Sequence, residues 1–259
     1  MHDQCDTGQQ GSFGRCFGTI VRKSAFTFEN EIMDVESMKD ANKSVILPFE
    51  KQGDYYVEDL GELKGKLVYR FLKRAFDIIF SLTALLVLAL PMLIIALLVR
   101  MDSKGMPVYF QERLGLGGKK FRIVKFRTMY VDAESTSVQW SLGDEDERIT
   151  RVGKFLRKTR LDEIPQFWCV LKGDMSLIGP RPEREVFYNE FEKYIHGFSE
   201  RLKVRPGISG LAQINGGYNL KPEEKIVYDI EYIKNRSVWL DIKIVFGTVR
   251  VMVGRKDAK

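Results

Sequence analysis

One uncharged segment constrains the fold of this chain more than any other. Residues 78–99 run for 22 positions without Asp, Glu, Lys or Arg, and as a straight helix they would extend about 33 Å, enough to cross a bilayer. Pro91 lies near the middle, where a proline removes one backbone hydrogen bond and bends a helix. Basic residues flank both ends, so the positive-inside rule is best met when both ends are cytosolic. From these residues, a kinked spanning helix and a re-entrant helix both stay open.

Charge is distributed unevenly along the chain. Residues 1–66 carry 12 acidic and 8 basic residues, whereas residues 67–259 carry 23 acidic and 33 basic ones. A basic main body suits phosphates, nucleic acid or an anionic membrane surface. The three cysteines form no CxxC pair and no cleavable signal pattern occurs, which favours a reducing cytosolic compartment. Two histidines cannot by themselves build a zinc site or a Ser-His-Asp triad, so any catalysis would use carboxylates and amines, with a hard metal as an option.

Around the apolar segment, the pattern predicts two simple regions. Residues 1–60 are polar with early glycines, and we expect them to be weakly ordered, with one short helix near 34–42. Residues 107–129 alternate as two strands around the glycines at 115–118. Those glycines could suggest a phosphate loop, but the GxxxxGK[ST] spacing and a following helix pattern are lacking, so a hairpin turn is favoured.

The C-terminal half predicts helices and loops. The acidic run 144–147 reads as a solvated loop, and residues 150–158 as a basic helix. Residues 186–203 place aromatic side chains at helical spacing, which predicts an amphipathic helix. Residues 204–218 read as a glycine-rich loop, and residues 222–253 as two more helices. The aromatic faces could be core or membrane-interface contacts; core is the default.

Two neighbouring carboxylates, Asp162 and Glu163, lie among basic residues. Such a pair is usually an ordinary helix start. In a basic pocket, however, one carboxylate could attack phosphorus while the other holds Mg²⁺. On a helix, neighbours diverge by about 100° and would face different parts of one site, and Thr159 is expected to cap that helix. The Gly-Pro-Arg-Pro turn that follows presents Arg181, which suits bidentate phosphate contact.

Six segments together resemble the bacterial sugar transferase family, the monotopic phosphoglycosyl transferases that act on polyprenyl phosphate. They are KRAFDIIFS, PVYFQERLG, FRIVKFRTM, TRVGKFLRKTRLDEIPQFWCVLKGDMSLIGPRPE, VRPGISGLAQING and DIEYIKNRSVWLDIKI. The resemblance covers residues 68 to about 254. It implies an α/β fold with a re-entrant membrane helix at 67–104, then a compact mixed catalytic domain at 105–259 with a small β-hairpin or sheet and membrane-associated amphipathic helices. A variable, weakly ordered region at 1–66 precedes them.

The resemblance also implies a two-step transfer at the cytoplasmic face of the cell membrane. Asp162 attacks the β-phosphate of a nucleotide diphosphate sugar, usually a UDP-hexose, and the enzyme-bound phosphosugar then passes to polyprenyl phosphate, usually undecaprenyl phosphate. Glu163 assists with Mg²⁺, and both carboxylates are the implied metal ligands. The product would start exopolysaccharide, capsule or other glycoconjugate synthesis. The implied phosphate- and substrate-binding residues are Lys125, Arg157, Arg181 and Asp229.

The sequence departs from the family pattern at three places. Family members often have Ser where this chain has Arg160, and Arg where it has Gly217; both departures bear on recognition of the nucleotide sugar. Leu90 precedes Pro91 in place of a frequent Ser, which removes a hydroxyl that could replace the lost backbone bond. The bend itself should persist.

The same residues allow two alternatives to an enzymatic function. One is a catalytically idle, membrane-docked binding or scaffold protein of the glycan assembly machinery; a carboxylate pair among bases argues against it. The other is a nucleic-acid binder, which the dispersed charge and the apolar segment disfavour. The expected partners are therefore a nucleotide sugar, polyprenyl phosphate and membrane phospholipid, with a homodimer left open and the sugar not indicated.

Overall fold

The computed structural model describes residues 45–46, 53–63, 65–131, 133, 138–139, 146–216 and 220–253. All of them belong to one compact unit, Ser44–Lys259. The helix expected near 34–42 and Gly217 lie outside the described residues, and the domain boundaries expected at residues 66 and 104 stay predictions. The elements of the unit are β1 Val45–Ile46, β2 Tyr55–Tyr56, α2 Leu67–Val87, α3 Ala89–Asp102, β3 Val108–Leu114, β4 Lys120–Phe126, β5 Val138–Gln139, α4 Arg151–Thr159, α5 Gln166–Lys172, β6 Ser176–Ile178, α6 Glu185–Phe191, β7 Ile195–His196, β8 Gly207–Ser209, α7 Leu211–Asn215, α8 Pro222–Asn235 and α9 Val238–Val253.

The sheets are small, and most of the described unit is helical, so the expected mixed α/β fold with a small hairpin is confirmed. Strands β3 and β4 form an antiparallel hairpin from the pair Val108–Phe126 to the pair Leu114–Lys120. Gly117 and Gly118 adopt positive φ angles of 66° and 76° in its turn, a conformation that favours glycine. The hairpin interpretation of this glycine run is therefore right. Parallel pairs join β1 to β5, β2 to β7 and β6 to β8.

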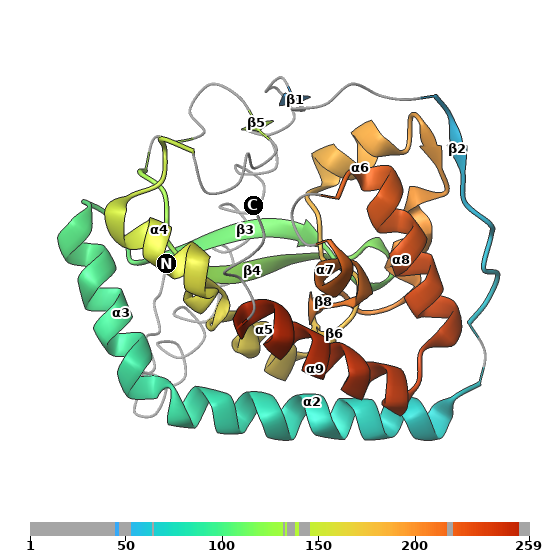
Figure 1. Cartoon of the computed structure of the whole chain (residues 1–259), viewed down its shortest axis with the longest axis horizontal. Helices are drawn as coiled ribbons and strands as arrows, with labels where there is room; N and C mark the ends of the chain where they lie inside the picture. The colour runs from blue at the N-terminus through green and yellow to red at the C-terminus, as the bar shows by residue number, and fades with distance from the viewer. Residues whose placement is uncertain are drawn as a thin grey trace, which may run out of the picture. The chain divides into compact units, whose positions relative to one another are not determined.

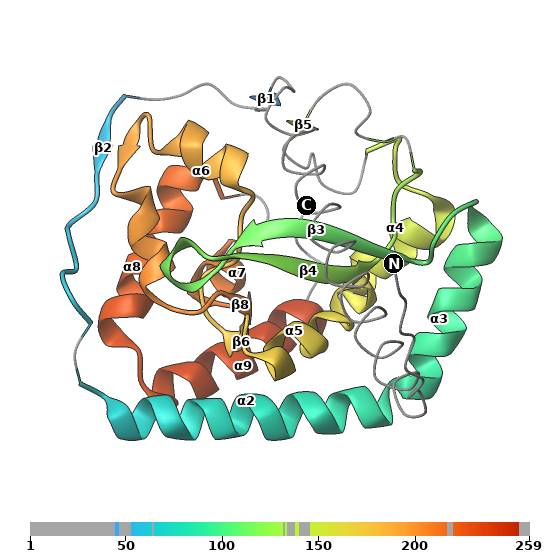
Figure 2. The same cartoon turned by 180° about the vertical axis from the view of Figure 1, so that it is seen from behind.

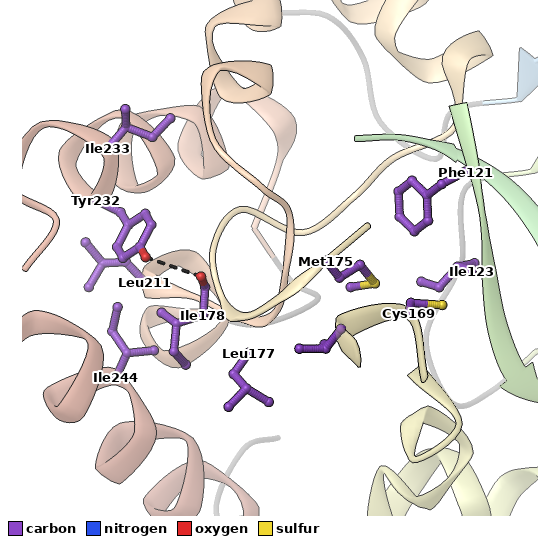
Figure 3. Packing of buried hydrophobic residues seen from close by; sticks show 11 residues of the cluster. Phe121, Ile123, Cys169, Met175, Leu177, Ile178, Leu211, Tyr232, Ile233 and Ile244 are labelled. Atoms are coloured by element: carbon purple, nitrogen blue, oxygen red, sulfur yellow. Dashed lines mark hydrogen bonds between the residues drawn. The ribbon is translucent and has the colours of Figure 1, made fainter. Parts of the chain in front are cut away.

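The main hydrophobic core joins the hairpin to the helices that follow it. Figure 3 shows Phe121 and Ile123 of β4 on one side and residues of β6, α8 and α9 on the other. The hydroxyl of Tyr232 donates to the carbonyl oxygen of Ile178 at 3.2 Å, so this buried polar group is satisfied. The core holds the hairpin in a fixed position relative to α8, and both elements contribute to the cavity described below.

The helix expected over 186–203 is only partly present, because α6 ends at Phe191. The Glu192 carboxylate accepts hydrogen bonds from the backbone nitrogens of Gly197 and Ser199, at 2.7 and 2.9 Å, and Gly197 has a positive φ of 92°. These contacts turn the chain into β7 and a 3₁₀ segment, Phe198–Lys203. The expected burial of the aromatic side chains is nevertheless right. A second core cluster contains Phe187, Phe191, Tyr194, Ile195 and Phe198.

The segment expected as a glycine-rich loop also contains regular structure. Residues 207–209 form β8, parallel to β6, and residues 211–215 form α7. Gly207 is needed there because a Cβ atom would lie 2.1 Å from the nitrogen of Gly179. The two helices expected over 222–253 are confirmed as α8 and α9.

Helices α2 and α3 meet at Leu88 with a bend of 62°. Pro91 is the third residue of α3, and a proline there cannot donate to the carbonyl of Val87, four residues earlier. The bend therefore lies three residues before Pro91, near the carbonyl that this proline leaves without a donor. No single helix among the described residues is long and apolar enough to cross a membrane; only this bent pair passes that test, as a broken span or a re-entrant loop.

Helix α2 turns its polar side chains towards the rest of the unit. Asp77 is buried and accepts hydrogen bonds from the Oγ of Ser176 and the nitrogen of Leu177, at 3.1 and 3.0 Å. Arg74 donates to two carbonyl groups at the end of α5. Figures 1 and 2 show α2 running beside α5 and α9, with α3 leaving it at an angle. The other side of α2 exposes large apolar side chains, among them Leu67, Val68, Phe71, Leu72, Phe76, Ile79, Leu86 and Val87.

Candidate active site

Helix α4 is held tightly against the segment that follows β4. Thr150 begins the helix, and its hydroxyl accepts a hydrogen bond from the nitrogen of Gly153 at 3.0 Å. A Cβ atom at Gly153 would lie 2.1 Å from the carbonyl oxygen of Thr128, so a glycine permits this close approach. One consequence is that Arg157, a turn later, donates through Nε to the hydroxyl of Thr128 at 3.0 Å.

Asp162 and Glu163 lie in a 3₁₀ turn, Leu161–Glu163, between α4 and α5. The expected helix cap by Thr159 is wrong, because its hydroxyl donates backwards to the carbonyl oxygens of Phe155 and Leu156 within α4. The chain leaves α4 at Arg160, a residue with a positive φ of 59°. The carboxylates therefore lie in a tight turn and not at a helix N-terminus.

Glu163 accepts hydrogen bonds from two predicted phosphate-binding residues. Its Oε1 accepts from Nζ of Lys125 at 3.0 Å and from Nη2 of Arg181 at 2.6 Å. Arg181 belongs to the Gly-Pro-Arg-Pro turn, which begins at Gly179, where a Cβ atom would meet the carbonyl oxygen of Arg205 at 2.5 Å. The turn after β6 and strand β4 thus bring their basic side chains to the same carboxylate.

One cavity of about 550 Å³ collects the predicted residues. Asp162, Lys125, Arg157, Arg181 and Asp229 line it, and Glu163 lies directly behind Lys125 and Arg181. Among the described residues, the lining holds three acidic residues and ten basic ones, namely Arg113, Lys125, Arg127, Arg148, Arg157, Arg160, Arg181, Arg184, Arg201 and Lys225. Such an excess of cations with apolar walls suits a phosphorylated ligand.

The two neighbouring carboxylates differ in their electrostatics. Burial raises the pKa of Asp162, and the negative charge of Glu163 adds to the rise. Burial also opposes ionisation of Glu163, but Arg181 and Lys125 outweigh it and hold the pKa of Glu163 well below its usual range. Among the described residues, Oδ1 of Asp162 is buried without a hydrogen-bond partner. Glu163 is thus fixed by its partners, whereas Asp162 keeps a poorly solvated oxygen at the cavity wall.

Asp229 lines the cavity but faces a partner within the protein. Its Oδ2 accepts from Nε of Arg201 at 2.7 Å, and both side chains are almost fully buried. Arg201 also donates through Nη2 to the carbonyl oxygen of Arg181 at 2.9 Å. Burial raises the pKa of Asp229 while Arg201 opposes the rise. The geometry gives Asp229 a positioning contact, through Arg201, to the Gly-Pro-Arg-Pro turn.

The carboxylates fit a magnesium ion in number and chemistry. Mg²⁺ is commonly held by one or two carboxylates together with substrate phosphates and water. The hydrogen bonds from Lys125 and Arg181 to Glu163 both end on Oε1, and Oδ1 of Asp162 has no partner among the described residues. No group of three or more potential metal ligands occurs in the described part of the chain, so a substrate diphosphate would have to complete the site.

Sequence reasoning missed several basic residues of this cavity, including Arg113, Arg148, Arg184, Arg201 and Lys225. They come from separate elements, and no fixed spacing connects them. The expected solvated loop at 144–147 is also corrected at Asp146, which is buried and paired with Arg148 at 2.5 Å. The only local feature of the sequence that could have indicated this ion pair is the position of Arg148 two residues after Asp146.

Comparisons with known proteins identify the family of this chain. Residues 68–255 match the family model described as bacterial sugar transferase. The chain is 46% identical over 197 residues to a UDP-N-acetylgalactosamine-undecaprenyl-phosphate N-acetylgalactosaminephosphotransferase of Aeromonas hydrophila, covering 75% of this chain and 46% of that protein. It is 44% identical over 187 residues to a UDP-glucose:undecaprenyl-phosphate glucose-1-phosphate transferase of Escherichia coli (strain K12), covering 70% and 40%.

A third relative is the UDP-galactose-lipid carrier transferase of Erwinia amylovora, 38% identical over 203 residues, with 73% of this chain and 42% of that protein covered. This chain therefore spans less than half the length of these curated relatives. The family model, in contrast, matches well over half of this chain. The chain belongs to the bacterial sugar transferase family.

Proposed function

We propose that this chain transfers a sugar-1-phosphate from a nucleotide diphosphate sugar, a UDP-hexose, to a membrane polyprenyl phosphate. The observation that carries the proposal is Asp162 at the wall of this cavity: within the described part of the chain, its Oδ1 is buried without a hydrogen-bond partner, and ten basic residues line the cavity. The names of two relatives, which pair a UDP-sugar with undecaprenyl phosphate, support this choice of donor and acceptor.

The first step forms a covalent intermediate. An oxygen of the Asp162 carboxylate attacks the β-phosphorus of the donor, a new O–P bond forms, and the bond to the nucleoside monophosphate breaks. The leaving phosphate takes the electron pair. Asp162 suits this role because its poorly solvated carboxylate is more reactive once ionised, and because neighbouring cations favour that ionised form.

The second step regenerates the carboxylate. A phosphate oxygen of polyprenyl phosphate attacks the same phosphorus, the bond to Asp162 breaks, and a polyprenyl diphosphate sugar leaves. Arg181 and Lys125 hold positive charge beside the reacting phosphate, and Glu163 keeps both side chains oriented. Mg²⁺ held by Glu163 and Asp162 would neutralise charge on the phosphate oxygens of the bound donor.

The membrane placement is part of the proposal. We infer that α2 and α3 form a re-entrant loop at the cytoplasmic face, with both ends on the side where nucleotide sugars are made. The 62° bend and the exposed apolar side of α2 support it. Phospholipid acyl chains would cover the side chains that α2 presents to its surroundings.

Turnover of a panel of UDP-sugars tests the chemistry. The protein, in detergent or nanodiscs with polyprenyl phosphate and Mg²⁺, should release UMP and form the lipid-linked sugar. Mass spectrometry of the quenched protein should find a hexose-phosphate on the peptide containing Asp162. Asp162→Asn should abolish both signals, whereas Asp59→Asn, a change at an exposed acid, should retain them. An active Asp162→Asn enzyme would refute the nucleophile, and a folded wild type without UMP release from any donor would favour an idle scaffold.

Cysteine labelling tests the topology. Single cysteines at positions 60 and 220, in a chain lacking Cys5, Cys16 and Cys169, are exposed to an impermeant thiol reagent outside intact cells. A re-entrant loop leaves both positions unlabelled until the cells are broken. Labelling of position 60 alone in intact cells contradicts it and indicates a spanning segment.

A further inference from the structure

The guanidinium of Arg157 is held at one end and accessible at the other. Its Nε donates to the hydroxyl oxygen of Thr128 at 3.0 Å, and both residues line the cavity. Its terminal nitrogens, Nη1 and Nη2, make no hydrogen bond with any described residue, and neither of them is buried. Because Arg157 belongs to the cavity lining, these two nitrogens can bind a ligand there.

The shape of a guanidinium determines which of its edges a ligand can use. The group is planar and carries N–H donors on Nε and on both terminal nitrogens. Nε and one terminal nitrogen form one edge that can bind two oxygens of a phosphate, and the two terminal nitrogens form another. In Arg157 the contact with Thr128 occupies Nε. The edge formed by Nη1 and Nη2 is therefore the one that remains for a phosphate.

Thr128 is itself held firmly by its neighbours. Its carbonyl oxygen accepts from the nitrogen of Thr150 at 2.9 Å, and a Cβ atom at Gly153 would lie 2.1 Å from the same oxygen. The preceding residue, Arg127, donates through Nη2 to the carbonyl oxygen of Ser103 at 2.8 Å. The side chain of threonine is also branched at Cβ, which restricts its χ1 angle. The hydroxyl of Thr128 is therefore a fixed anchor for Arg157.

An anchored arginine binds a phosphate at a lower entropic cost than a mobile one. The side chain of arginine has several rotatable bonds, and ordering them on binding costs free energy. A group that is already fixed in the binding geometry avoids part of this cost. We propose, given the transfer reaction above, that Thr128 is a positioning residue: its hydroxyl holds the guanidinium of Arg157 so that Nη1 and Nη2 bind a phosphate of the nucleotide sugar.

The kinetics of three variants test this role. Thr128→Val removes the hydroxyl and keeps the shape, Thr128→Ser keeps the hydroxyl, and Arg157→Gln removes the guanidinium. We expect kcat/KM for a UDP-sugar to fall about tenfold in Thr128→Val and by no more than about threefold in Thr128→Ser. In an Arg157→Gln background, Thr128→Val should have little further effect, because the group that it positions is gone. Equal losses in Thr128→Val and Thr128→Ser, or additive losses in the double variant, overturn the proposal.

The matched control is Thr159→Val, the same change at another threonine of α4. The hydroxyl of Thr159 donates to the carbonyl oxygens of Phe155 and Leu156 within the helix. Its loss should leave kcat/KM within about twofold of the wild-type value, measured at a temperature where every variant is folded. If Thr159→Val loses as much activity as Thr128→Val, the effect reflects the stability of α4, and the positioning role is overturned.

Binding of UDP separates this inference from the reaction on which it rests, because UDP carries the diphosphate and needs no turnover. The dissociation constant for UDP should rise about tenfold in Thr128→Val and in Arg157→Gln, and should stay near the wild-type value in Thr128→Ser and Thr159→Val. If the wild type releases no UMP from any donor but shows this pattern, the role of Thr128 stands and the transfer reaction falls. Equal binding of UDP by the wild type and Thr128→Val, or no binding by the wild type, overturns the role of Thr128. A rise confined to the KM for polyprenyl phosphate does so too, because it places the acceptor at Arg157.

Discussion

Asp229→Asn should weaken folding as well as activity, because Asp229 is the counter-ion of a buried arginine. The side chains of Arg201 and Asp229 are 1% and 2% exposed, and their ion pair is 2.7 Å long. Asparagine fits the same space but leaves the guanidinium charge without its partner. Arg201 also lies over the ring of Phe198, at 4.7 Å, so it has little room to reach water.

The size of the effect follows from that burial. Removing one partner of a buried ion pair costs about 3–5 kcal/mol, because the remaining charge stays desolvated. For a unit of about 200 residues, each kcal/mol shifts the unfolding temperature by about 2–4 °C. Asp229→Asn should therefore unfold about 6–20 °C below the wild type. Activity should also be lower than that of the wild type at temperatures where the variant is still folded, because Arg201 donates a hydrogen bond to the carbonyl oxygen of Arg181.

Thermal unfolding in one detergent, followed by UMP release at a temperature where every variant is folded, provides the measurement. Lys193→Gln breaks an exposed ion pair with Glu190 and should leave the unfolding temperature within about 4 °C of the wild-type value. The double variant Arg201→Met with Asp229→Leu should regain part of the lost stability, since no charge stays buried. An Asp229→Asn protein that unfolds like the wild type but does not turn over would show instead that Asp229 acts on the substrate.

Four further outcomes are expected. Arg181→Lys keeps the charge but loses the planar fork, so kcat/KM should fall about tenfold to a hundredfold, and a near-neutral result would make the Gly-Pro-Arg-Pro turn structural only. Since burial raises the pKa of Asp162, kcat/KM should rise with pH through that raised value and be lost below it; Glu163→Gln, which removes a neighbouring negative charge, should shift this limb to lower pH. Glu163→Gln should also raise the Mg²⁺ concentration needed for half-maximal rate, and an unchanged Mg²⁺ titration would remove Glu163 from the metal site. Pro91→Ala should straighten the bent pair and expose position 60 to external thiol reagent in some molecules; unchanged labelling would show that packing holds the bend.

The sequence predicts local features of this fold better than those made by distant contacts. Alternation and glycines were enough for the β3–β4 hairpin, and hydrophobic spacing was enough for the burial of Phe187 and Phe191. The prediction of a continuous helix over 186–203 failed because the Glu192 carboxylate accepts from the backbone nitrogens of Gly197 and Ser199, a contact that periodicity does not report. The parallel pair β6–β8 was missed because each strand has three residues, too few to show an alternating pattern, and the two strands are far apart in the sequence.

The site shows the same division. Asp162, Glu163 and Arg181 lie in one short block of sequence, so motif reasoning reached them, and the cavity brings Lys125, Arg157 and Asp229 to the same place. Arg201 was missed because its partners, Asp229 and the carbonyl of Arg181, lie far away in the sequence. The burial of Oδ1 of Asp162 without a partner among the described residues results from how distant segments pack, so the spacing of residues in the sequence does not reveal it.

The bent helix pair is connected to Asp162, the proposed nucleophile, through one hydrophobic cluster. Ile95 and Val99 of α3 pack with Phe126 and Leu156, and Leu161, the residue before Asp162, packs against the same cluster. The carboxylate of Asp102, at the end of α3, also accepts from the nitrogen of Val152 in the first turn of α4 at 3.1 Å, where a negative charge is favourable. The direction in which α3 leaves Leu88 therefore helps to set the position of α4 and of the turn that holds Asp162. A change of angle at the bend would reach the active site through packed side chains, without any contact between the bend and the substrate.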